Sequence, residues 1–238
     1  MNGVTAACVS DTGLVRERNE DAFFVGQRCI AVADGMGGHI AGEVAAGIAI
    51  DTVKANVSLL EAGQKAPGEC VREANMRVLE AASADSALEG MGTTLTLAVV
   101  GGNDLRVAHV GDSRAYLITG GQVMRLTDDH SVVGEMVRSG ALTADQAHSH
   151  PGRHAITRAL GFVDDLEVDT GSWSFGRGDA AVLCTDGLHD VVSDEEILQA
   201  VLSKAGEGPE AICSHLVALA KERGGPDNIT VAVALRSS

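Results

Sequence analysis

The sequence predicts an α+β fold: a four-layer α-β-β-α sandwich in which two antiparallel β-sheets are flanked by helix pairs. Two observations predict it. Two helical patterns, a series of short strands and two further helical patterns follow one another, without the regular strand–helix alternation of a parallel βαβ protein. In addition, turns rich in Gly, Asn and Asp join consecutive strands in the middle of the chain, as in an antiparallel meander.

The predicted strands are short runs rich in Val, Ile, Thr and Ala, many of them bounded by Gly, Asn or Asp. They are Thr5–Ser10, Cys29–Ala33, Thr93–Val100, Leu105–Val110, Ala115–Ile118, Val123–Leu126, Glu167–Trp173, Ala180–Cys184 and Ile229–Leu235. Asn103-Asp104 and Gly120-Gly121 are predicted to be hairpin turns between consecutive strands.

Four long helical patterns flank this meander in two pairs. They are, approximately, Ala41–Leu60, Pro67–Ala87, Asp194–Ala205 and Pro209–Arg223. Pro67 suits the first turn of a helix, where its missing N–H is not needed. Ser193 is a predicted N-cap, since the acidic residues Asp194 and Glu195 follow it and complement the helix dipole.

We expect residues 1–238 to form a single domain, because this length suits one large domain and 45% hydrophobic residues can build a sizeable core. The least regular part runs from about Asp128 to Asp165 and is rich in Ser, His, Gly and charged residues. We expect it to form a mobile lobe, called the flap below.

Composition excludes several classes of partner. A formal net charge of −15 repels polyanions, so neither nucleic acid nor an anionic membrane surface is expected to bind. Five scattered cysteines without a CxxC pair suggest neither a zinc knuckle nor a redox motif. The first residues lack the features of a signal peptide, and no run approaches the ~18 apolar residues of a membrane span. The sequence therefore predicts a cytoplasmic protein.

Four aspartates at the ends of hydrophobic strands carry the chemical information. Asp34 and Asp186 each end a buried run and precede Gly, Asp227 runs directly into the last strand, and Asp112 lies between two strands. A single Asp-Gly is most often only a turn. Four such acids are harder to explain as turns, because buried carboxylates without partners are costly. Lys and Arg are sparse near them, which favours bound Mg²⁺ or Mn²⁺ over ion pairs.

Six short motifs occur in a fixed order from the beginning to the end of the chain. They are Arg16-Glu-Arg-Asn-Glu20-Asp21, Asp34-Gly-Met-Gly-Gly-His39, Gly92-Thr-Thr94, Gly111-Asp-Ser-Arg114, Asp186-Gly-Leu-His-Asp190 and Gly225-Pro-Asp-Asn228. This set resembles that of the metal-dependent protein phosphatases of the phosphatase 2C type, specifically their compact bacterial branch. The four-layer sandwich of that family agrees with the predicted order of elements.

The resemblance implies a role for each matching residue. Asp34 would bridge two cations, with the Gly35 carbonyl as a further ligand, and Asp186 and Asp227 would complete the protein ligands. Asp112 and Asp190, together with Asp186, match a third, weaker metal site. The residues expected to support the ligands, by holding coordinated waters or packing beside them, are Glu20, Asp21 and Asn228. The implied cofactors are two Mn²⁺ or Mg²⁺ ions per subunit, with the third site as an addition.

Two residues are candidates for contact with the substrate. Arg16 is predicted to bind the phosphate, since its guanidinium offers a bidentate fork that lysine lacks. His39 is a candidate catalytic residue, but Met36 stands where many relatives carry a histidine directly after Asp-Gly. His39 therefore has three open roles: general acid, residue that orients a water, and start of the following helix. A coordinated water is an alternative proton donor.

The resemblance implies metal-dependent hydrolysis of phosphoserine and phosphothreonine in proteins by a metal-activated water. We expect a monomer that opposes a bacterial serine/threonine kinase. Three rivals remain open: a hydrolase of small phosphate esters or nucleotides, a binding module without activity, and a purely structural acidic domain. A zinc site formed by His148, His150 and His154 is a minor alternative, because three histidines in a polar loop lack a sustained ligand geometry.

Overall fold

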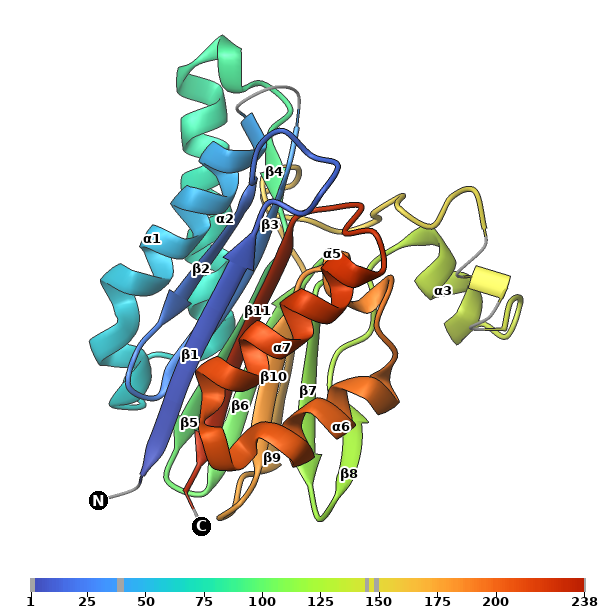
Figure 1. The fold of residues 1–238 in the computed structure, drawn as a ribbon. Helices are drawn as coiled ribbons and strands as arrows, with labels where there is room; N and C mark the ends of the chain where they lie inside the picture. Colours follow the sequence, from blue (N-terminus) through green and yellow to red (C-terminus); the bar gives the residue numbers. More distant parts are fainter. Residues whose placement is uncertain (1–2, 38–40, 144–145, 148–149, 238) are drawn as a thin grey trace.

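Two antiparallel sheets form the centre of the protein in a computed structural model, which describes residues 3–37, 41–143, 146–147 and 150–237 (Figure 1). The first sheet contains, in spatial order, β1 (Val4–Asp11), β11 (Ile229–Arg236), β10 (Ala180–Cys184), β7 (Arg114–Thr119) and β8 (Gln122–Arg125). The second contains β2 (Asp21–Val25), β3 (Cys29–Met36), β5 (Leu95–Gly101), β6 (Asp104–Val110) and β9 (Asp169–Ser174), with β4 (Gly92–Thr93) paired to β3.

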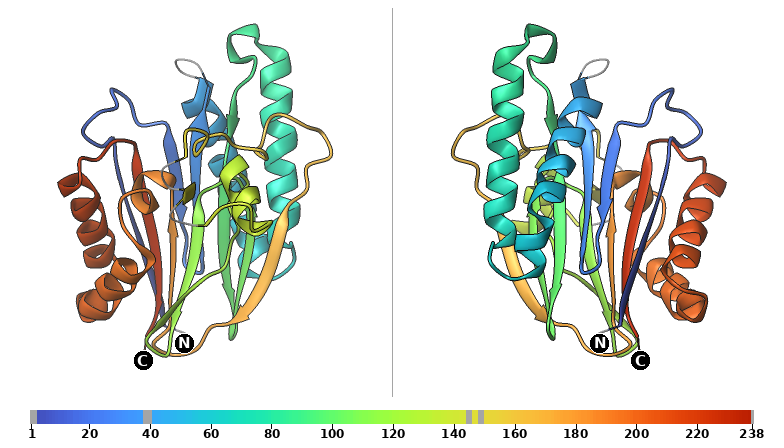
Figure 2. Two further views of the ribbon diagram at one scale, coloured as in Figure 1. Left: turned by 90° about the vertical axis from the view of Figure 1, so that its right-hand side faces the viewer. Right: turned by 90° about the vertical axis from the view of Figure 1, so that its left-hand side faces the viewer.

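A pair of helices covers the outer face of each sheet, as predicted (Figure 2). The second sheet is covered by α1 (Ala41–Glu61) and α2 (Pro67–Ala84), and the first by α6 (Asp194–Lys204) and α7 (Pro209–Glu222). Shorter helices are α3 (Val132–Arg138), α5 (Asp186–His189), η1 (Ser86–Leu88) and η2 (Ala205–Glu207). The predicted four-layer α-β-β-α sandwich is therefore confirmed.

The alternation of side chains along each strand divides the core into layers. In β10, Val182 and Cys184 pack toward α6 and α7, whereas Ala181 and Leu183 pack against the other sheet. Successive side chains of a strand point to opposite faces, so a central strand buried on both sides reads as a continuous apolar run. Aromatic side chains are scarce, and the core is correspondingly made mostly of Ala, Val, Leu and Ile.

The hairpin predictions were half right. Gly120 and Gly121 form the two-residue turn between β7 and β8, and both have positive φ, as a type I′ turn requires. The turn between β5 and β6 is formed by Gly102-Asn103 and not by Asn103-Asp104, because Asp104 pairs with Gly101 as the first residue of β6. The positive φ of Gly102 explains the shift by one residue.

Short elements of the described residues that were not predicted include β2, β4, α3 and α5. β4 is a two-residue strand that exists only because it pairs with the end of β3, a long-range contact with no local signal. The predicted helix Pro67–Ala87 ends earlier, at Ala84, because Asp85 caps η1 by accepting a hydrogen bond from the Ala87 N–H (2.9 Å).

Asn75 joins α2 to the end of the flap. Its side chain is 1% exposed. Its Nδ2 donates to the Val163 carbonyl (2.8 Å), and its Oδ1 accepts from the Gly161 N–H (2.9 Å). One buried amide thus satisfies two backbone groups of a segment that lies far away in the sequence.

Asn75→Ala is expected to lower the free energy of unfolding by about 1–3 kcal/mol, because it removes a buried amide that makes two hydrogen bonds to the backbone of Gly161 and Val163. The higher helix propensity of Ala offsets only a few tenths of this loss. Urea unfolding of the purified protein measures the change. Met76→Ala, at the next and exposed position of α2, is the control and should stay within about 0.5 kcal/mol of the wild type. Equal stability of the two variants would contradict the assigned role.

Candidate metal centre

Asp34 lies near the end of β3 and is held there by its backbone. Its N–H donates to Thr94 Oγ1 (2.8 Å), and its carbonyl accepts from the Thr94 N–H (2.9 Å). Gly35 follows and is buried; a Cβ at this position would lie 2.1 Å from the Gly42 carbonyl oxygen. Only glycine therefore allows the first turn of α1 to approach β3 so closely, which explains the Asp-Gly pair.

Asp21 begins β2 and pairs directly with Asp34 across the sheet. Its Oδ2 accepts hydrogen bonds from the hydroxyls of Thr185 (2.8 Å), just after β10, and Thr230 (2.6 Å), in β11. Its Oδ1 is buried and has no hydrogen-bond partner within the described residues. Burial raises the pKa of Asp21 to about 7, although the two hydroxyl donors oppose the shift.

Asp186 and Asp190 lie one helical turn apart at α5, which directly follows β10. The Asp190 N–H donates to the Asp186 carbonyl (2.9 Å), so both side chains project from the same side of the turn. Asp186 Oδ1 is buried without a hydrogen-bond partner in the part of the chain that the structure describes. Burial, followed by the charges of Asp112 and Asp227, raises the pKa of Asp186 well above its usual value.

Asp112 lies in the turn between β6 and β7 and is 7% exposed. His189 of α5 braces this turn, because its Nε2–H donates to the Asp112 carbonyl (3.0 Å). Burial lowers the pKa of His189 to about 3, so the imidazole is neutral at pH 7. Asp112 Oδ1 is a third buried carboxylate oxygen without a hydrogen-bond partner among the described residues. Burial and the neighbouring Asp129 raise the pKa of Asp112 to about 7.

Asn228 positions the loop between β1 and β2. Its Nδ2 donates to the carbonyls of Thr12 (2.9 Å) and Arg18 (2.8 Å), and its Oδ1 accepts from the Glu20 N–H (2.8 Å). The Glu20 carbonyl in turn accepts from the Gly35 N–H (3.2 Å). Asn228 therefore acts by holding the loop that carries Arg16, Glu20 and Asp21.

Arg16 projects from this loop toward Asp227. Its Nη2 donates to Asp227 Oδ2 (2.7 Å), while 54% of the Arg16 side chain stays exposed. The hydrogen bond to Asp227 is the largest cause of a raised Arg16 pKa, and Asp186 and Asp34 contribute through their charges. The guanidinium therefore lies at the open edge of the acidic cluster.

The predicted acids converge although they are far apart in the chain. Besides burial, four neighbouring carboxylates raise the pKa of Asp34 well above its usual value; these are Asp21, Asp186, Asp112 and Asp227. Three buried carboxylate oxygens in the described residues lack hydrogen-bond donors, a costly arrangement unless cations neutralise it. An all-oxygen donor set suits hard cations such as Mg²⁺ and Mn²⁺. The residues present therefore fit a divalent metal centre.

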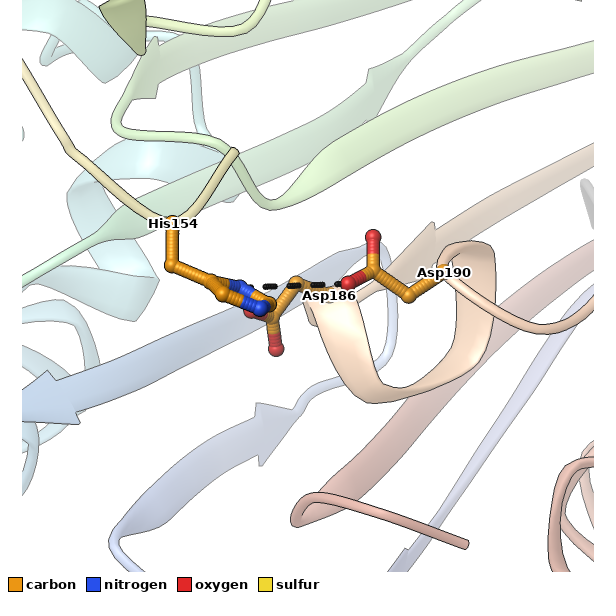
Figure 3. Close-up of side chains that lie close together, drawn as sticks. All are labelled: His154, Asp186 and Asp190. Atoms are coloured by element: carbon orange, nitrogen blue, oxygen red, sulfur yellow. Dashed lines mark ion pairs between the residues drawn. The ribbon is translucent and has the colours of Figure 1, made fainter. Parts of the chain in front are cut away.

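Of the four histidines that the sequence analysis singled out, the structure describes His150 and His154. His39 and His148 lie outside the described residues. His150 is occupied within its own loop, where its Nδ1 accepts from the Gly152 N–H (3.0 Å). His154 instead faces α5, with its Nδ1 4.0 Å from Asp186 Oδ2 and 3.9 Å from Asp190 Oδ2 (Figure 3).

Sequence reasoning missed the pairing of His154 with Asp186 and Asp190. Nothing local links a histidine in an irregular loop to two acids on a distant helical turn. Thr94, Thr185 and Thr230 were likewise not predicted to orient the carboxylates. The available signal was their position: Thr94 belongs to the Gly92-Thr-Thr94 motif, and Thr185 directly precedes Asp186.

Comparison with known proteins gives the site a context. The family model described as protein phosphatase 2C matches residues 19–229. The chain is 42% identical to the serine/threonine protein phosphatase PstP of Mycobacterium tuberculosis, over 96% of this chain and 44% of that protein. It is 36% identical to the serine/threonine phosphatase Stp of Listeria monocytogenes, over 95% of this chain and 94% of that protein. The chain thus spans less than half of the first relative and nearly all of the second.

Solved structures agree. A crystal structure of the M. tuberculosis phosphatase PstP superposes with a TM-score of 0.89 at 40% identity and covers 99% of both chains. A structure of the PstP catalytic domain in complex with two manganese ions gives a TM-score of 0.88 at 38% identity, with 99% of both chains covered. The matched family model covers most of the chain, and the acidic cluster fits divalent cations: the chain belongs to the protein phosphatase 2C family of metal-dependent serine/threonine phosphatases.

Proposed function

We propose that this protein hydrolyses phosphoserine and phosphothreonine in proteins, using two divalent cations held by the acidic cluster. The observation that carries the proposal is the convergence of buried, unpaired carboxylate oxygens beneath the exposed guanidinium of Arg16. The named relatives and the two manganese ions of the PstP complex support it.

Asp34, Asp186 and Asp227 are the proposed side-chain ligands of the two cations, with the Gly35 carbonyl. When bound, such a pair lowers the pKa of a coordinated water and neutralises charge on the phosphate. Glu20 and Asp21 are the proposed residues that hold coordinated waters beside these ligands. Asp21 already accepts two threonine hydroxyls through one oxygen, which leaves the other to accept a hydrogen bond from a coordinated water.

Arg16 is the proposed phosphate-binding residue. Its ion pair with Asp227 holds the guanidinium at the edge of the site in an orientation that leaves half of the side chain accessible. A planar guanidinium can donate two parallel hydrogen bonds to phosphate oxygens. The arginine would thus hold the phosphoryl group over the carboxylates and offset part of their repulsion of an anionic substrate.

The leaving alkoxide of serine or threonine needs a proton. His39 is the proposed source, with a coordinated water as the alternative. Asp112 and Asp190, with Asp186, are the proposed ligands of a third cation. The flap, residues 128–165, is proposed to control substrate access, because it reaches the site at His154.

The cellular setting is proposed from the same family relation. A bacterial serine/threonine kinase would supply the phosphoproteins, and the enzyme would act as a cytoplasmic monomer. None of the helices in the described part of the chain combines the length and the hydropathy that a membrane span requires.

Phosphate release from a phosphothreonine peptide tests the proposed function. EDTA should abolish release and Mn²⁺ should restore it. Asp34→Asn should reduce turnover by more than about 100-fold, because a cation ligand loses its charge, while circular dichroism shows an unchanged fold. Asp51→Asn, an exposed acid on α1, is the matched control and should keep wild-type turnover. Near-normal activity of Asp34→Asn would refute the ligand assignment, and faster release from nucleotides than from the peptide would favour the small-molecule rival.

Arg16→Lys should raise KM for the phosphopeptide about tenfold, because a point charge replaces a bidentate donor. Steady-state kinetics under saturating Mn²⁺ measures the effect. Arg18→Lys, in the same exposed loop, makes the same substitution away from the proposed phosphate contact and should leave KM within twofold. An unchanged KM in Arg16→Lys would remove Arg16 from the phosphate site.

The metal-free protein should become more stable at neutral pH when Asp112 is replaced by Asn. The pKa of Asp112 is raised to about 7 from its ordinary value of 3.8, so between these two pH values the folded state holds this proton while the unfolded state releases it. The free energy of unfolding of the wild type therefore falls as pH rises from about 4 to 7. Asn cannot ionise, so Asp112→Asn avoids this loss.

Thermal unfolding in EDTA measures the difference between the two proteins. Asp112→Asn should exceed the wild type by on the order of 1 kcal/mol at pH 7.5 and by much less at pH 4.5. Added Mg²⁺ should shrink or reverse the advantage at pH 7.5, since a cation stabilises the ionised carboxylate. A difference that is the same at both pH values would show that Asp112 is not held protonated.

A further inference from the structure

His154, Asp186 and Asp190 form a cluster whose nearest donor atoms all lie within 4.8 Å of one another (Figure 3). Two donors that each lie about 2.1 Å from one ion are at most about 4.2 Å apart. The distances from His154 Nδ1 to the two carboxylates, 4.0 and 3.9 Å, satisfy this limit. One ion between the three side chains therefore needs only small side-chain rotations.

The position of His154 is fixed by backbone hydrogen bonds on the residues that follow it. The Val132 N–H donates to the Ala155 carbonyl (2.8 Å), and the Thr157 N–H donates to the His130 carbonyl (2.8 Å). His130 in turn donates its N–H to the carbonyl of Gly111 (2.7 Å), the residue before Asp112. Hydrogen bonds therefore link the loop that carries His154 to the turn that carries Asp112.

A second, independent observation points to a cation. Asp112 is 93% buried and its Oδ1 has no hydrogen-bond partner in the described residues. Asp186 Oδ1 is a second buried oxygen without such a partner in the same part of the chain. Both acids line one cavity of about 430 Å³ together with Asp190 and His154. The neighbouring Asp129 accepts two hydrogen bonds from Arg114 (2.7 and 3.0 Å). The Arg114 guanidinium is therefore paired with Asp129 and not with Asp112.

We propose that His154 Nδ1 is a ligand of the cation held by Asp186 and Asp190, and that this site takes Zn²⁺ in preference to Mg²⁺. Imidazole nitrogen suits Zn²⁺, whereas Mg²⁺ prefers oxygen ligands and retains its waters. Divalent affinity at nitrogen-containing sites also rises from Mn²⁺ to Cu²⁺, with Zn²⁺ below Cu²⁺ but above Mn²⁺. The proposal rests on the proposed function in taking up the third cation that Asp112, Asp186 and Asp190 are proposed there to hold, and in sharing Asp186 with the catalytic cations.

An ion at this site would join the flap to α5. His154 belongs to the flap, whereas both acids belong to the turn that begins at the catalytic ligand Asp186. Occupancy by Zn²⁺ would therefore hold the flap against the active-site entrance. The level of available Zn²⁺ would then control access of bulky phosphoproteins separately from the Mg²⁺ or Mn²⁺ that serves catalysis.

Long-range ¹H–¹⁵N correlation spectra of the histidine side chains test the ligand directly, with Zn²⁺ added in the presence of excess Mg²⁺. We expect the His154 Nδ1 resonance to shift to the position of a zinc-bound nitrogen, and Mg²⁺ alone to leave it in place. The spectra of His154→Ala and His39→Ala assign the signal. No shift of the His154 resonance, or a shifted signal that survives in His154→Ala, would overturn the proposal.

Competition with a fluorescent zinc chelator gives the affinity. His154→Ala should bind Zn²⁺ at least tenfold more weakly than the wild type in excess Mg²⁺, and His215→Ala, which removes an exposed imidazole from α7, should match the wild type. Equal affinity of His154→Ala and wild type would refute the ligand role. Neither measurement needs turnover, so a zinc-bound His154 in a protein that fails to hydrolyse phosphopeptides would disprove the proposed function and leave this site intact.

Discussion

The arrangement of the molecule depends on one electrostatic constraint: several carboxylates meet at one end of the sandwich with too few protein donors to neutralise them. Asp21, Asp112 and Asp186 each keep a buried oxygen without a hydrogen-bond partner in the described residues. Burial, followed by the charges of neighbouring carboxylates, raises the pKa values of these acids. The centre is therefore unfavourable as protein alone and becomes favourable when cations bind, which couples stability to the same ions that the proposed chemistry uses.

Both halves of the sandwich contribute hydrogen-bonding groups that hold the carboxylates in place. Asp34 is held by hydrogen bonds from its backbone to Thr94, between β4 and β5. Asp21 is held by the hydroxyls of Thr185, just after β10, and Thr230, in β11. Asn228 then ties the loop that carries Arg16 to the beginning of β11. Catalytic geometry of this kind needs ligands whose orientation is set by packing and by neighbouring hydrogen bonds. The threonines and Asn228 therefore have a definite role: they orient the acids and the loop that carries Arg16.

Much of the fold and of the candidate site could be predicted, for identifiable reasons. Helix patterns, apolar strands such as Ala180–Cys184 and the Gly120-Gly121 turn are local signals that reflect burial and backbone conformation. β4 and the shift of the β5–β6 turn to Gly102-Asn103 were not predictable in the same way. The first requires pairing with the distant end of β3, and the second depends on the register between two strands. His39 remains a prediction, because it lies outside the described residues.

The sequence by itself determined which acids are available and that they end buried strands, because an aspartate after an apolar run and before glycine is a local pattern. It also determined the family, through six short motifs in order. Only the tertiary structure decided which oxygens stay unpaired, that Asp227 faces Arg16, and that His154 meets Asp186 and Asp190. The physical reason is that hydrogen-bond satisfaction and ligand distances depend on groups far apart in the chain, which come together only when both sheets and the flap are packed.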